Sequence, residues 1–119
     1  MSTLDWFARH RFVQPIGQCG NAVFYLAEDK TNNAFVVVRQ YILHSNNPDE
    51  AERQAGTFED EVRLYSLLHS KGLIRTFESE SIEGKLFMVF DPQSVCELVC
   101  SHLKPENIDK AISEASKGK

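Results

Sequence analysis

Short runs of aromatic and β-branched residues alternate with polar, glycine- or asparagine-containing segments through the first third of the chain. The runs span residues 11–16, 22–28 and 34–43, and residues of these types favour strands. Residues 17–20 contain two glycines and residues 29–33 read Asp-Lys-Thr-Asn-Asn, and both compositions are typical of turns. The pattern therefore predicts three strands that form two consecutive hairpins.

The spacing of apolar residues becomes helical in the middle of the chain. One stripe recurs at intervals of four, three and three residues and consists of Phe58, Val62, Tyr65 and Leu68. It predicts a helix over residues 57–70 that Thr57 caps and Gly72 ends. The preceding segment, 47–55, begins Asn-Pro-Asp-Glu, a typical helix start whose Asn is the cap. It predicts a separate short helix that stops at Gly56.

The rest of the chain returns to strands and then to helices. Residues 73–82 and 86–91 predict two strands joined by a turn at 83–85. The pattern after them is helical, and its clearest apolar stripe consists of Ile108, Ala111, Ile112 and Ala115. We therefore predict one α+β domain over residues 1–119, with a five-stranded antiparallel sheet, one main helix between the third and fourth strands, and short C-terminal helices.

The charge balance narrows the classes of partner. Thirteen Lys and Arg residues against seventeen Asp and Glu residues give a net charge of −4, so no basic stripe is available for phosphate backbones and we expect no nucleic-acid partner. No apolar run comes near the roughly 20 residues of a membrane span. We expect a cytoplasmic protein, and Arg9 and Arg11 keep an organelle-targeting start open as an alternative.

Three cysteines are an odd number without the spacing of a disulfide framework, which indicates free thiols. Cys96 and Cys100 would share a helix face close to His102. A zinc site needs about four ligands, however, and no second pair of Cys or His residues has matching spacing. We therefore expect buried structural thiols, no metal ion and no other cofactor.

The order of the predicted elements is informative in itself. Residues 9–91 begin with a predicted strand, a glycine-containing loop and two further strands, the second of which carries one cation. A helix with a central acid follows, and then two more strands. This order resembles the amino-terminal lobe of protein kinases. Residues 92–119 would then be a hinge-like connector and short helices.

The loop between the first two strands departs from the family pattern. In the family a loop G-x-G-x-x-G-x-V covers the nucleotide phosphates, because residues without side chains let backbone amides approach the phosphate oxygens. Here Gly17 holds the first glycine position, Cys19 and Ala22 replace the other two, and Gly20 lies one place off the pattern. A glycine-containing turn between two strands also needs no ligand, so both interpretations stay open.

Two charged residues occupy positions that matter in the family. The lysine of the family's V-A-I-K motif falls on Arg39, and the glutamate of the following helix falls on Glu61. Because arginine presents a planar fork that suits a carboxylate, we predict that Arg39 forms an ion pair with Glu61 instead of contacting phosphate. The alternative is that residues 59–61 form a solvated acidic first turn, favoured by the helix dipole.

The fifth predicted strand resembles the strand that leads into the kinase hinge. Phe90 would be the gatekeeper residue at the back of an adenine pocket, and Asp91 would begin the connector. The vestigial nucleotide-binding positions that the resemblance implies are therefore Gly17, Gly20, Arg39, Glu61, Phe90 and Asp91.

The catalytic motifs of the family are missing. Phosphoryl transfer there needs the Asp of H-R-D-x-x-x-x-N and the metal-binding Asp of D-F-G, and neither motif occurs in the sequence. Residues 103–107, Leu-Lys-Pro-Glu-Asn, resemble the interior of the catalytic loop, but we interpret residues 104–107 as the start of a helix. We therefore expect no catalytic residue and no enzymatic activity.

The absence of a second lobe has a consequence for binding. The underside of the lobe, which in the family packs on the nucleotide and on the other lobe, would be exposed apolar surface, and such surface usually marks a binding face. We expect a non-catalytic, pseudokinase-like interaction module, a scaffold or structural subunit whose underside other protein subunits cover. Three alternatives stay open: the front part of a longer kinase or pseudokinase, a weak regulatory nucleotide-binding module, and an unrelated α+β domain with the same order of elements.

Overall fold

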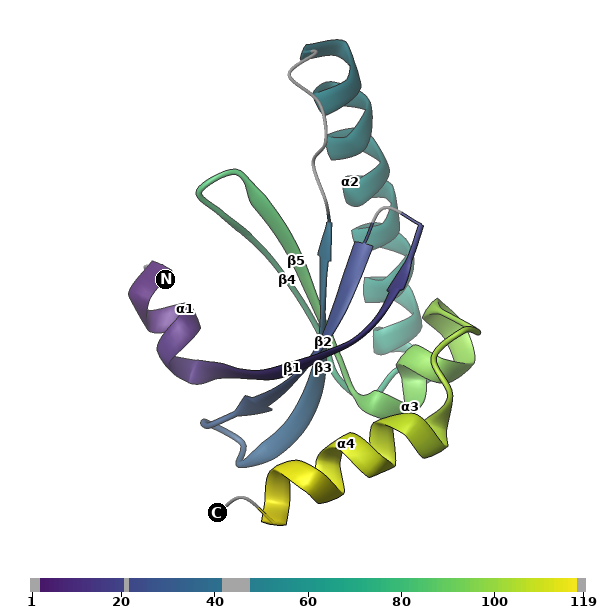
Figure 1. Ribbon diagram of the computed structural model, residues 1–119. Helices are drawn as coiled ribbons and strands as arrows, with labels where there is room; N and C mark the ends of the chain where they lie inside the picture. The colour runs from purple at the N-terminus through teal and green to yellow at the C-terminus, as the bar shows by residue number, and fades with distance from the viewer. Residues whose placement is uncertain (1–2, 21, 42–47, 118–119) are drawn as a thin grey trace.

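Five antiparallel strands form the centre of the molecule (Figure 1). The computed structural model describes residues 3–20, 22–41 and 48–117. The strands lie in the order β1-β2-β3-β5-β4, and their bounds are His10–Cys19 (β1), Ala22–Asp29 (β2), Ala34–Tyr41 (β3), Phe77–Ile82 (β4) and Lys85–Phe90 (β5). The predicted α+β fold, with one main helix between the third and fourth strands, is confirmed.

Strand β1 is longer and less regular than the predicted strand over 11–16. It continues to Cys19, so that Gly17 pairs with Phe24 inside the ladder with β2. Two register shifts, between Phe12 and Gln14 and between Pro15 and Gly17, interrupt this ladder. The turn itself lies at Gly20, whose φ of 61° belongs to the left-handed region that glycine adopts without strain.

The other end of the sheet follows the predicted pattern with one difference. Strand β4 begins at Phe77, so the first four residues of the predicted strand 73–82 are not part of the sheet. The turn between β4 and β5 has positive φ angles at both central residues, 51° at Glu83 and 79° at Gly84. Two left-handed residues in succession are the turn geometry that matches the twist of a two-residue hairpin.

One continuous helix, α2 (Pro48–Ser70), replaces the two helices predicted on either side of Gly56. The predicted break was wrong because a single glycine weakens a helix by only about 1 kcal/mol. Thr57 is not a cap, since its Oγ donates to the carbonyl oxygen of Arg53, 3.1 Å away and one turn back. The expected cap at residue Asn47 lies outside the described residues.

The end of α2 and its buried face agree with the sequence pattern. Gly72 has a φ of 81°, and the Leu73 N–H donates to the Leu68 carbonyl oxygen at 2.9 Å, which closes the helix. The predicted stripe faces the sheet and consists of the buried Phe58 and Tyr65 and the half-buried Val62 and Leu68. The amino-terminal part of α2 extends beyond the sheet (Figure 1).

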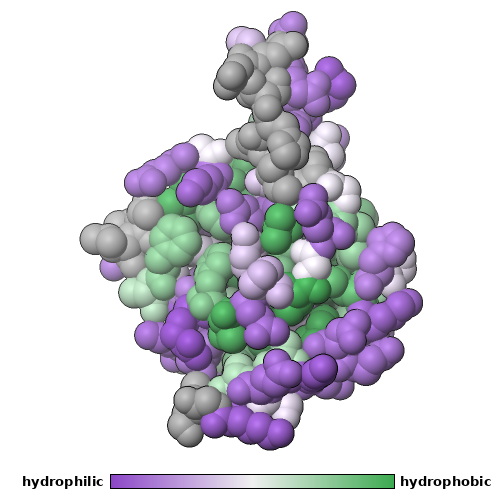
Figure 2. Space-filling model, in the orientation of Figure 1, coloured by the Kyte–Doolittle hydropathy of each residue, from purple (hydrophilic) through white to green (hydrophobic). Residues whose placement is uncertain are grey.

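Three short helical segments follow β5 and lie under the same face of the sheet as α2. They are α3 (Pro92–Ser94), the π-helical turn η1 (Val95–Val99) and α4 (Pro105–Lys117). The predicted helix start within residues 104–107 is confirmed, because α4 begins at Pro105. The outer side of α4 is hydrophilic (Figure 2), while Ile108 and Ala111 on its other side are buried.

The opposite face of the sheet is covered by a helix that the sequence pattern did not predict, α1 (Thr3–Arg9). Trp6 is its buried anchor, at 2% exposure, and its ring lies 4.8 Å from the ring of Phe87 and 4.5 Å from that of His10. Arg9 fixes the end of the helix by pairing with Asp29 at 3.2 Å and with Glu78 at 2.7 Å. Both faces of the sheet therefore carry a packed core.

Candidate functional site

The cation of β3 pairs with the central acid of α2. Arg39 Nη1 lies 2.6 Å from Glu61 Oε2, and the two side chains are only 12% and 28% exposed. The predicted ion pair is confirmed. Because water screens a partly buried pair less than a surface pair, its charges interact more strongly, and removing one partner leaves the other uncompensated.

Aromatic side chains surround this ion pair. The Tyr41 hydroxyl donates to Glu61 Oε2, and the Arg39 guanidinium lies 4.6 Å from the centre of the Tyr41 ring and 5.8 Å from that of Phe24, within cation–π range. Burial, followed by the hydrogen bond to Glu61, raises the pKa of the Tyr41 hydroxyl. Burial also raises the pKa of the Tyr65 hydroxyl, and the nearby Arg39 opposes that rise. The guanidinium is thus held by its own chain on several sides.

The alternative interpretation of the acidic segment does not hold. Residues 59–61 lie in the middle of α2, which begins at Pro48, and so are not a first turn. Glu59 and Asp60 are exposed to solvent, whereas Glu61 is half-buried and turned towards Arg39. The three carboxylates therefore do not form one solvated group.

The glycine at the family's first loop position is covered by a leucine. A Cβ atom placed on Gly17 would lie 2.6 Å from Cδ2 of Leu103, a residue of the connector between η1 and α4. Gly20, by contrast, is exposed and has no atom within 4 Å of such a Cβ. Gly17 thus permits close packing by the C-terminal segment, and Gly20 serves the turn.

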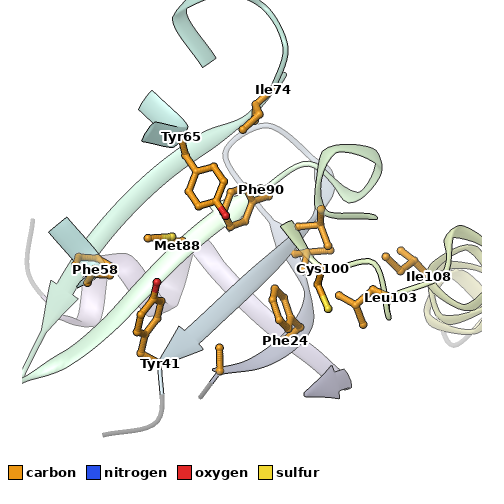
Figure 3. Close-up of a cluster of buried hydrophobic side chains, with 13 residues drawn as sticks. Phe24, Tyr41, Phe58, Tyr65, Ile74, Met88, Phe90, Cys100, Leu103 and Ile108 are labelled. Atoms are coloured by element: carbon orange, nitrogen blue, oxygen red, sulfur yellow. The ribbon is translucent and has the colours of Figure 1, made fainter. Parts of the chain in front are cut away.

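The underside of the sheet, which we expected to be open, is filled by the chain's own C-terminal segment. That segment contributes four buried residues to the core on this face, namely Val95, Cys100, Leu103 and Ile108. They belong to one cluster with Phe24 and Val37, and Figure 3 shows Leu103 lying between Phe24 and Ile108. Phe24 holds the last position of the loop motif, so this packing lies where the resemblance implies a nucleotide.

The two hinge positions are also occupied by structural contacts. Phe90 is fully buried and its ring lies 5.2 Å from that of Tyr65 and 5.3 Å from that of Phe77. The Asp91 carboxylate accepts hydrogen bonds from the backbone N–H groups of Arg75 (3.1 Å), Thr76 (3.0 Å) and Ser94 (3.2 Å) and from the Ser94 hydroxyl (2.9 Å). Burial raises the pKa of Asp91, and these hydrogen bonds lower it to a net value below the ordinary one.

A pocket of about 430 Å³ opens beside the hinge segment. Its lining includes the apolar side chains of Ile108 and Ile112 of α4 and the charged side chains of Arg75, Glu97 and Asp109. Sequence reasoning missed it because it forms where Arg75 and the segments 91–97 and 105–112 come together in the fold. Nothing in the local pattern of any one segment signals it.

The three cysteines are free, with Cys100 buried and the other two half-buried. The neighbouring Cys100 thiol, followed by burial, raises the pKa of the Cys19 thiol. Within residues 3–20, 22–41 and 48–117, no three His, Cys, Asp or Glu side chains are grouped so that they could hold a metal ion.

Three of the most exposed large apolar side chains lie near the end of α2. Leu64, Leu67 and Leu73 are 50%, 52% and 59% exposed, and the other two exposed residues of this kind in the described part of the chain are Phe7 and Leu98. The sequence contains the signal for the two helical leucines, since both fall outside the stripe that faces the sheet. Exposed apolar residues that gather in one place are candidates for a binding surface.

Comparison of the chain with protein-family models, with curated proteins and with solved structures yields no match in any of the three. Among the helices of the described residues, none combines the length and the apolar character needed to cross a bilayer.

Proposed function

We propose that this chain is a non-catalytic protein-interaction module that resembles a kinase amino-terminal lobe and serves as a scaffold or structural subunit in the cytoplasm. The observation that carries the proposal is the contact of Leu103 with Gly17. A phosphate group needs the space next to the loop backbone, and here a side chain of the same molecule occupies that space.

The polar groups at the other family positions support the proposal. Arg39 is committed to Glu61 and to the aromatic rings beside it, so a phosphate would have to displace an internal ion pair. Asp91 accepts four hydrogen bonds within the chain. Together with the missing H-R-D and D-F-G motifs, these contacts favour the interpretation that Arg39 and Asp91 stabilise the fold and do not bind a nucleotide.

The partner surface that we propose is the outer side of α2 and not the underside. The underside is closed by the chain itself, whereas Leu64, Leu67 and Leu73 present apolar surface to solvent. Apolar side chains that a folded domain leaves in water are stabilised when a protein partner covers them.

Titration with ATP tests the absence of nucleotide chemistry. We expect no change in melting temperature at about 5 mM ATP, with or without Mg²⁺, and no phosphoryl transfer to a general protein substrate. A ligand present at 100 times its Kd would stabilise the fold by about 2.7 kcal/mol, which corresponds to a rise of roughly 10 °C for a domain of this length. A rise of several degrees would contradict the proposal.

The variant Leu103→Ala sharpens this experiment, because it removes the side chain that lies on Gly17. If nucleotide stabilises the wild-type protein as strongly as it stabilises this variant, Leu103 does not close the site and the proposal fails. We expect the wild-type protein to be insensitive to nucleotide whatever the variant does.

A further inference from the structure

Asp60, Leu64 and Leu67 on the outer side of α2, and Lys71 directly after its last residue, form a row. Their spacings of four, three and four residues keep them on one side of a helix. The helical hydrogen-bond pattern continues to the end of the row, because the Lys71 N–H donates to the Leu67 carbonyl oxygen at 3.1 Å. The two leucines are half-exposed, so this row faces solvent and not the sheet.

The row is complementary to itself when it is reversed. It begins with an acid, continues with two leucines and ends with a base. If two copies of α2 lie antiparallel, Leu64 of each copy meets Leu67 of the other, and Asp60 of each meets Lys71 of the other. A parallel arrangement would instead bring acid to acid and base to base, which is unfavourable.

We propose that α2 pairs antiparallel with α2 of a second copy of this chain through Asp60, Leu64, Leu67 and Lys71. This inference rests on the proposed function as an interaction module and specifies one of its partners. Both charged groups are accessible for the contact. Lys71 has no ion pair within the described residues, and Asp60 pairs only with Arg63, where both side chains are more than 70% exposed and the pair is weak.

The size of the surface sets the expected strength of the dimer. The row spans about 16 Å at 1.5 Å per residue, and Leu73, 59% exposed, adds apolar surface beyond its end. Stable interfaces bury about 1,200 Å² or more in total, and smaller ones are typical of transient complexes. The dimer should therefore be weak and should form only as the protein concentration rises.

Sedimentation velocity over a concentration series from about 10 µM to about 1 mM tests the pairing. We expect the average mass of the wild-type chain to rise from that of a monomer towards that of a dimer. The double variant Leu64→Glu/Leu67→Glu should stay monomeric throughout. The control is Leu98→Glu, which makes one such substitution at another exposed leucine, on η1, and should dimerise like the wild-type chain.

Charge reversal distinguishes self-pairing from binding of any other partner. Asp60→Lys and Lys71→Glu should each weaken self-association by about tenfold, since each turns two attractive contacts into two repulsive ones. An equimolar mixture of the two variants should associate as the wild-type chain does, because each charge then meets its opposite on the other variant. The double variant D60K/K71E should also recover association.

Two results would overturn the inference. One is a wild-type chain that stays monomeric over the whole range, and the other is a dimer whose two charge variants do not recover association when they are mixed. Neither result bears on the absence of nucleotide binding. Conversely, stabilisation by ATP would contradict the proposed function and leave the pairing of α2 unaffected.

Discussion

Replacing Gly17 with alanine should destabilise the protein, although alanine is normally preferred to glycine inside a strand. The new Cβ would lie 2.6 Å from Cδ2 of Leu103, closer than such atoms approach in folded proteins. Leu103 is 6% exposed, so its side chain has little room to move away without leaving the core. Either Leu103 or the connector that carries it must shift.

The expected size follows from two opposing effects. Crowding a packed core typically costs about 1–3 kcal/mol, and replacing glycine in a strand gains back roughly 0.5–1 kcal/mol, which leaves a net loss of about 1 kcal/mol at the middle of both ranges. Unfolding 119 residues has an entropy of about 250 cal/mol/K, so 1 kcal/mol changes the melting temperature by about 4 °C. Gly17→Ala should therefore melt about 5 °C below the wild-type protein.

A double-mutant cycle followed by thermal or urea unfolding measures the contact itself. Leu103→Ala alone should cost about 2–4 kcal/mol through the cavity that it leaves. Because that cavity accommodates the new methyl group, the loss in the double variant should be smaller than the sum of the two single losses by about 1 kcal/mol or more. Gly56→Ala is the matched control, since no atom lies within 4 Å of its Cβ, and it should raise the melting temperature. Additive losses, or a stabilising Gly17→Ala, would refute the reasoning.

Two further predictions concern the polar groups. Arg39→Leu should lower the free energy of unfolding by about 2–4 kcal/mol in urea titrations, because Glu61 is left partly buried without its cation; Arg63→Ala, which breaks an exposed pair, should cost less than about 1 kcal/mol. The hydrogen bonds to Asp91 lower its pKa in the folded state, so its contribution is complete above pH about 4 and is lost as pH falls through that lowered pKa. The stability difference between the wild-type protein and Asp91→Asn should shrink when melting is measured from pH 6 down to pH 2.

Each of these predictions has a clear contrary outcome. Equal losses for Arg39→Leu and Arg63→Ala would mean that the pair with Glu61 is no stronger than a surface pair. A stability difference for Asp91→Asn that stays constant from pH 6 to pH 2 would mean that the carboxylate charge is not what the surrounding N–H groups stabilise.

The parts of the fold that could be predicted are those whose signal is local. Strand runs, the turn at 83–85 and the stripe from Phe58 to Leu68 each specify an element within a few residues. The ion pair of Arg39 with Glu61 was predictable only because the order of elements resembles a known lobe, since 22 residues separate the two side chains. Where the pattern misled, as at Gly56, the local penalty was too small to end a helix.

The remaining features depend on contacts between distant segments. Helix α1 has seven residues, too few to form alone, and it depends on the burial of Trp6 against Phe87. The closure of the underside depends on Leu103 meeting Gly17, 86 positions earlier in the chain. The spacing of apolar residues in the C-terminal segment predicted helices correctly. It did not indicate which face of the sheet those helices would cover.

The order of the strands leaves β1 and β4 at the two edges of the sheet, where unpaired backbone groups invite other chains to add strands. Each edge carries a feature that discourages such growth. Strand β1 contains Pro15 and two irregularities in its ladder, and β4 carries glutamates at 78 and 80. Proline, bulges and charges are the means by which natural sheets avoid aggregation at their edges. A chain that associates through a helix can thus reach high concentrations without its sheet becoming a template for amyloid-like assembly.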